Sequence, residues 1–75
     1  MKYTLLAIFL HLTATGTGTF TGANREFQSN ENCEVMRAAV AHGASETDPV
    51  ILSDCQTGQE VAVFHFVVGP GKETP

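Results

Sequence analysis

The clearest pattern of apolar positions lies in the C-terminal half of the chain, between Glu60 and Val68. β-Branched and aromatic residues fill this segment without a break, which predicts a β-strand. Successive side chains of a strand point to opposite faces, so both faces of this strand are expected to be largely apolar. One face carries Val61, Val63, His65 and Val67, and the other carries Ala62, Phe64, Phe66 and Val68. A strand of this kind is a central strand, an oligomer contact or a covered edge.

A second strand is expected just before it. Pro49 favours an extended backbone at the residue that precedes it, and Val50-Ile51-Leu52 then begins an apolar run. The polar, glycine-containing residues 56–59 have the length of a hairpin connection. The sequence therefore predicts a β-hairpin over about residues 50–68.

A different period appears from Cys33 onward. Cys33, Met36 and Val40 are spaced three and four residues apart, which predicts a short helix over residues 33–42. Asn32 is the expected cap at its start, and Gly43 is expected to end it. A strand is the competing interpretation, because the segment is short and rich in valine. The expected fold is a small disulfide-closed α+β domain, or a mostly β one.

The N-terminal segment has the layout of a signal peptide. Met1-Lys2 is followed by an apolar run from Tyr3 to Ala14 and then by a region rich in glycine and threonine. Cleavage is expected between Gly16 and Ala23, with the site after Ala23 as the first choice. The alternatives are an uncleaved membrane anchor, for which the run is short against the roughly twenty residues needed, and a buried helix of a cytosolic domain.

This interpretation divides the chain into a signal peptide (1–23) and a secreted domain (24–75), with a loose N-terminal segment (24–32) and a frayed tail (69–75). The 75 residues carry a net charge of -4. Removal of residues 1–23 would leave three basic and eight acidic residues, so the charge would become 3 - 8 = -5. An acidic surface disfavours binding to nucleic acid, and after signal cleavage it disfavours binding to anionic membranes.

The two cysteines, Cys33 and Cys55, are expected to form a disulfide within the chain. Disulfides persist in oxidising compartments, and a domain of this size has little core to stabilise it. The bond would close a loop of 23 residues, which contributes about 3.4 kcal/mol on chain-entropy grounds. Intermolecular disulfides and free thiols are the alternatives.

No catalytic, cofactor or metal site is expected. His42 and His65 join the two cysteines as potential zinc ligands, but the close spacings typical of zinc sites are missing. Ser53 or Ser45 with His65 and Asp54 supplies the residue types of a nucleophilic triad, but so small a domain seldom holds three groups and an oxyanion hole in place. The chain is therefore expected not to be an enzyme.

A short signal peptide, a small mature chain, the Cys33–Cys55 pair and a β-rich C-terminal half together resemble the small secreted effectors of filamentous plant pathogens. Among these, the layout is most similar to the disulfide-linked β-sandwich effectors called MAX, which have six strands and usually a longer mature chain. The resemblance implies an extracellular virulence or recognition role through binding a host or environmental protein, and delivery into a host is the alternative location. A toxin-like or antimicrobial peptide and an inhibitor-like binding module are the alternative functions.

The expected binding surface is the strand with two apolar faces. A chain this short can cover one face but not both, so the other is available to a partner or to a second copy. His65 lies near the centre of this segment as a potential pH-sensitive residue. The residues of this expected surface are Val61, Val63, Phe64, His65, Phe66 and Val67.

Overall fold

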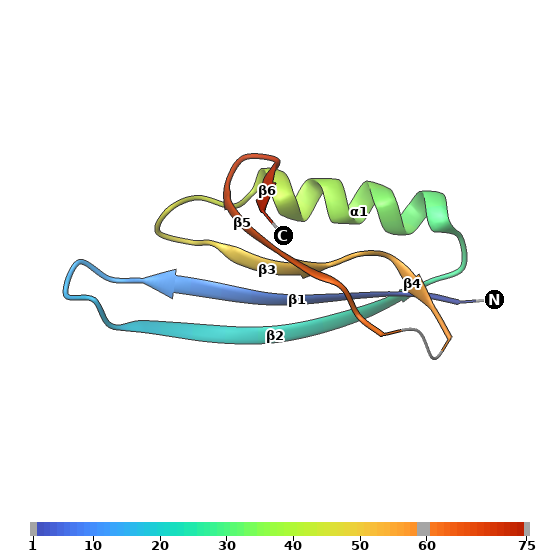
Figure 1. Ribbon diagram of the computed structural model, residues 1–75, viewed down its shortest axis with the longest axis horizontal. Helices are drawn as coiled ribbons and strands as arrows, with labels where there is room; N and C mark the ends of the chain where they lie inside the picture. The colour runs from blue at the N-terminus through green and yellow to red at the C-terminus, as the bar shows by residue number, and fades with distance from the viewer. Residues whose placement is uncertain (1, 59–60, 75) are drawn as a thin grey trace.

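The computed structural model describes residues 2–58 and 61–74. Within these residues the chain forms a sheet of six strands and one helix, which lies along one side of the sheet (Figure 1). The sheet order is β2-β1-β3-β5-β6, with β4 beside β1, and all pairings are antiparallel. The elements are β1 (Tyr3–Leu12), β2 (Gly18–Phe27), α1 (Asn30–His42), β3 (Val50–Ser53), β4 (Gln56–Thr57), β5 (Phe64–Gly69) and β6 (Lys72–Thr74).

β1 is a central strand. It pairs with β2 along its whole length, and its other edge pairs with β3 through Ala7–Phe9 and with β4 through Tyr3 and Thr4. The apolar run with the character of a signal peptide thus forms the middle of the sheet in the full chain. Cleavage after Ala23 would remove β1 and β2 as far as that residue, so cleavage stays a prediction about processing, and the fold described here is that of the uncleaved chain.

The glycine- and threonine-rich segment forms the turn after β1 and the first part of β2. The Thr13 amide donates to the Thr17 carbonyl (2.8 Å), and Gly16 has a φ of 84°, a left-handed conformation that glycine adopts without strain. The segment expected to be loose, 24–32, lies partly in β2, which continues to Phe27, and partly in the first turn of α1.

α1 confirms the helix expected from the spacing of Cys33, Met36 and Val40, and the strand alternative is wrong. The helix begins earlier than expected because Ser29, rather than Asn32, is its cap. The Ser29 hydroxyl accepts a hydrogen bond from the Asn32 amide (3.1 Å), the usual arrangement at a helix start. Gly43 ends the helix, as expected.

The hairpin predicted over residues 50–68 is confirmed by the pairing of β3 with β5, in which Ile51 lies opposite Phe66. β5 begins at Phe64, later than expected, and the residues just before it are outside the strand. Of the expected strand and connection, residues 59 and 60 lie outside the described residues. The tail expected to fray from residue 69 instead forms β6, which pairs with β5, and residue 75 lies outside the described residues.

The core lies between α1 and the face of the sheet that α1 covers. Cross-strand partners share a face of a sheet, and the pairs Ala7–Leu52 and Val50–Val67 place their side chains under the helix. The buried apolar residues are Leu5, Ala7, Cys33, Ala41, Ala44, Val50, Leu52 and Val67. Alternate residues of the same strands point to the opposite face, which no element of the described chain covers.

Candidate functional site

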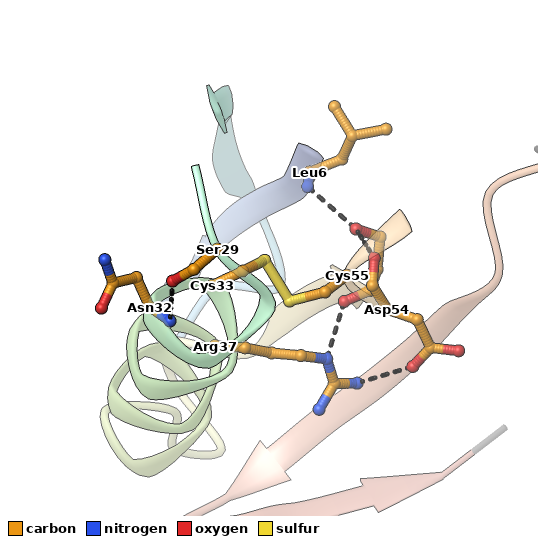
Figure 2. The surroundings of a disulfide bond; sticks show 8 residues. Leu6, Ser29, Asn32, Cys33, Arg37, Asp54 and Cys55 are labelled. Carbon is orange, nitrogen blue, oxygen red and sulfur yellow. Dashed lines mark hydrogen bonds and ion pairs between the residues drawn. A yellow bond between two sulfur atoms is a disulfide. The ribbon is translucent and has the colours of Figure 1, made fainter. Parts of the chain in front are cut away.

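The disulfide ties α1 to the segment between β3 and β4, which confirms the expected Cys33–Cys55 pair (Figure 2). Cys33 is buried in the core, and no free cysteine is present among the described residues. The bond therefore fixes the start of the helix against the sheet, at the end of the covered face where the hairpin connection leaves β3.

An arginine lies beside this disulfide and bridges the helix to the sheet. Arg37 Nε donates to the Ser53 carbonyl (2.8 Å), and its guanidinium forms ion pairs with Asp54 (3.3 Å) and with Glu73 of β6. The hydrogen bond from Arg37 lowers the pKa of Glu73, and the same bond raises the pKa of Arg37. Both carboxylates pair with the same guanidinium, so the cluster holds β6 and α1 together.

The residue types of a nucleophilic triad come close together here without forming one. His65 Nε2 lies 2.9 Å from Asp54 Oδ1. The neighbouring hydroxyl of Ser53 is fully buried, accepts a hydrogen bond from the Leu6 amide (2.9 Å) and donates one to the Asp54 carbonyl (3.0 Å). Ser45 lies in the loop before β3, where its hydroxyl accepts the Asp48 amide hydrogen bond. Both hydroxyls are thus engaged in local structure.

The remaining polar contacts are at the surface. His11 Nδ1 lies 2.7 Å from Asp48 Oδ1, and hydrogen bonds from His11 and Thr47 lower the pKa of Asp48. Within residues 2–58 and 61–74, no group of three or more His, Cys, Asp or Glu side chains is arranged to hold a metal ion. In the same part of the chain, no helix has the length and apolar character needed to cross a bilayer.

A further apolar surface is the sheet face opposite α1, here called the open face. Register places Ile8, Ile51 and Phe66 in one row across it. Leu6, Ile8, Leu10 and Ile51 are half-buried by their neighbours, whereas Phe20 is 76% and Phe66 40% exposed. The open face consists of Leu6, Ile8, Leu10, Phe20, Gly22, Asn24, Ile51, Phe64 and Phe66.

The open face contains part of the surface expected from sequence. Phe64 and Phe66 lie on it, with Phe64 lining a hollow of about 410 Å³ beside Gly22. Val67 is fully buried under α1, and His65 shares that covered side, where it meets Asp54. Val61 and Val63 are exposed but precede β5 and so fall outside its alternation. The two faces of this strand therefore differ: the phenylalanine side is open and the Val67 side is core.

β5 does not offer a free edge, because it pairs with β3 on one side and with β6 on the other. The two outer strands of the sheet are β2 and the three-residue β6. β2 offers the longer edge, because it runs for 10 residues and pairs with β1 without a register shift. An edge of this length is a template for an added strand, and natural proteins usually interrupt it with a bulge, a proline or charges. Between Gly18 and Asn24, β2 has no proline and no charged residue.

A groove runs beside this edge, on the side of the sheet that faces α1. It has a volume of about 170 Å³ and separates the helix from β2. Met36 and Val40 form its helical wall, and Ala23 and Arg25 form its strand wall. Arg25 is exposed, with its guanidinium carbon 5.9 Å from the ring centroid of Phe27. The complete lining is Leu5, Ala7, Phe9, Ala23, Asn24, Arg25, Met36 and Val40.

The β1 and β2 residues that form the open face and the groove are not among the residues of the binding surface expected from sequence. Their signal was an apolar run from Tyr3 to Leu12 with large side chains on both faces, the same property that marked the segment before Val68. The run also fits a signal peptide, because a charged residue precedes it and small residues follow it. β2 itself has little apolar character, so its place in the sheet follows from pairing with β1.

Comparison with protein-family models, with curated proteins and with solved structures found no match to this chain.

Proposed function

We propose that this protein is a non-enzymatic binding module, which captures an extended segment of another protein along the edge of β2. The observation that carries this proposal is the long, regular edge strand β2, uncharged from Gly18 to Asn24, with an apolar groove beside it. A segment that adds to a sheet edge gains affinity from main-chain hydrogen bonds and specificity from pockets that take its alternate side chains.

The groove defines the chemistry of the captured segment. Ala23 and the flanking Thr21 are small, so side chains of an added strand can reach over β2 to Met36 and Val40. Alternate positions of the segment would therefore be apolar. Arg25 is the charged residue of the groove lining, and it favours an acidic side chain near one end of the segment.

We propose an oxidising compartment, outside the cytoplasm, as the site of action. The Cys33–Cys55 disulfide supports it, because such bonds persist in secreted proteins. An effector-like role toward a host or environmental protein is the form of this proposal that the resemblance in layout favours. The engaged hydroxyls of Ser53 and Ser45 support a non-catalytic role.

A random peptide library displayed on phage tests the capture of an extended segment. Selection on the immobilised, oxidised 75-residue chain is expected to enrich peptides with alternating apolar residues and an acidic residue. Ala23→Lys places a charge in the groove beside the edge and should weaken binding of these peptides by at least about tenfold. The matched control is Val35→Lys, on the exposed side of α1, which should bind them as the wild type does. Enriched peptides that bind both variants equally, or a selection that enriches no such peptides, would overturn the proposal.

A further inference from the structure

The open face differs in charge from the rest of the molecule. None of the nine residues that make up the open face is charged, and Asn24 is the one polar side chain among them. Register also places Thr4 and Glu26, which pair with each other, at one end of this side of the sheet. The protein as a whole carries a net charge of -4. Lys2 and Glu26, at one end of this side of the sheet, form a pair with each other (3.8 Å). Two copies that meet through these nine residues therefore bring together neutral surfaces, and the Glu26 carboxylate at the border has Lys2 as its partner.

The chain also exposes more surface than a compact protein of its mass. Its accessible surface is 5054 Å² for 8.0 kDa, against about 4450 Å² expected for a compact monomer. The excess of about 600 Å² approaches the roughly 800 Å² that each partner contributes to a standard interface. The radius of gyration, 12.7 Å, likewise exceeds the about 11.3 Å expected for 75 residues. An interface across the open face would remove surface of this order from water.

The open face carries both a projection and a hollow. Phe20, near the turn end of β2, projects and is 76% exposed. Two residues further along the same face, Gly22 has no side chain, and the hollow of about 410 Å³ lies beside it between β2 and Phe64. A Cβ at Gly22 would meet nothing within 4 Å. A two-fold axis repeats each contact, so a surface that bears both a projection and a hollow can complement itself.

We infer that a second copy of this chain covers the open face, with the two sheets packed face to face about a two-fold axis. Phe20 of each copy inserts beside Gly22 of the other, and Phe64, Phe66 and Ile51 form the apolar centre of the interface. The two helices then lie on the outside. The two β2 edges and their grooves stay accessible, so the dimer presents two of the proposed capture sites.

Sedimentation velocity of the oxidised full chain over a wide range of concentration tests this inference. The wild type is expected to form a dimer that dissociates on dilution. Phe20→Lys and Phe66→Lys should each weaken dimerisation by roughly 100-fold or more, because each change occurs twice in a two-fold interface and removes an aromatic contact. Val35→Lys is the matched control, an exposed apolar residue (67%) on α1, and should dimerise as the wild type does.

Circular dichroism of each variant shows whether its fold is retained. Phe20→Lys is the decisive variant because Phe20 is the most exposed of the large apolar side chains on the open face. A wild type that stays monomeric at all concentrations would overturn the inference. So would a Val35→Lys effect equal to that of Phe20→Lys. Ala23→Lys separates the two proposals. If Ala23→Lys disrupts the dimer and Phe20→Lys does not, the dimer forms through the β2 edge, and the open-face dimer is overturned. Peptide capture is then judged by the phage selection alone.

Discussion

The two faces of the sheet are built from alternate residues of the same strands, yet their surroundings differ. Under α1, Leu52 and Val67 are fully buried, and Arg37 closes the margin of the core by bonding to Ser53, Asp54 and Glu73. On the open face, the neighbouring side chains Ile51 and Phe66 remain partly exposed. Apolar side chains alone therefore do not make a core: the disulfide and the helix decide which face is covered, and no element of the described chain covers the other.

The largest effect on the difference between the two faces is expected from removal of β1, which contributes side chains to both. A chain of residues 24–75 lacks β1, which supplies Leu5 and Ala7 to the covered face and joins β2 to β3. We expect this truncated chain to lose cooperative unfolding, because the loss of a central strand exposes the core and unpairs two neighbouring strands.

Thermal unfolding followed by circular dichroism, with the disulfide intact, measures this effect. The matched control is the full chain under the same conditions. Cooperative unfolding of residues 24–75 would instead support the mature domain expected from the signal-peptide interpretation, and the intact mass of the exported protein would show whether residues 1–23 are removed.

Lysine substitutions at two adjacent residues of β5 compare the covered face with the open face within one strand. Val67→Lys buries a charge in the core and should lower the free energy of unfolding by about 3–5 kcal/mol or more, enough to unfold so small a domain. Phe66→Lys places the same charge on the open face and should change the stability of the monomer by about 1 kcal/mol or less. Urea unfolding at a concentration below dimer formation measures both. Equal destabilisation by the two variants would mean that both faces are core.

The smallest expected effect concerns the polar margin of the covered face. The folded-state pKa of Glu73 is lowered by its hydrogen bond with Arg37. Its contribution to stability is therefore present above its ordinary pKa of 4.5 and is lost as the pH falls through the lower folded value. We expect Glu73→Gln to lower stability near neutral pH by about 1 kcal/mol.

Urea unfolding of the wild type and Glu73→Gln across acidic pH measures the difference between them, which should shrink as the pH falls below 4.5. Glu46→Gln, in the exposed loop before β3, is the control. A difference between wild type and Glu73→Gln that stays constant with pH would contradict an ionic contribution from Glu73.

Much of the C-terminal part of the fold could be predicted from sequence, because local signals and tertiary contacts agree there. The spacing of Cys33, Met36 and Val40 indicated the helix, and the Cys33–Cys55 pair follows from two cysteines in one small chain. The β3–β5 hairpin followed from its apolar runs. The start of β5 was predicted too early. Val61 and Val63 have high strand propensity, but the pairing of β5 with β3 begins only at Phe64.

The N-terminal part could not be predicted, for a physical reason. An apolar run such as Tyr3–Leu12 satisfies the interior of a sheet as well as the requirements of a signal peptide, and nothing in the run itself separates the two. β2, with Gly18 and Gly22, has weak strand propensity and is held in the sheet by its partner. Phe64 and Phe66 were identified as surface candidates from sequence, but the groove and the free edge depend on β2 and stayed out of reach.

The central position of β1 also has a consequence for the time course of synthesis. β1 leaves the ribosome before the strands that pair with it, and Ala7 pairs with Leu52, 45 residues later in the chain. At about 5–20 residues per second, roughly 2–9 s pass before that partner is made. During this interval β1 has β2 as its neighbour, while its second edge and its apolar side chains are without the partners that bury them in the finished fold. The nascent chain thus presents an apolar segment for seconds before the fold can bury it.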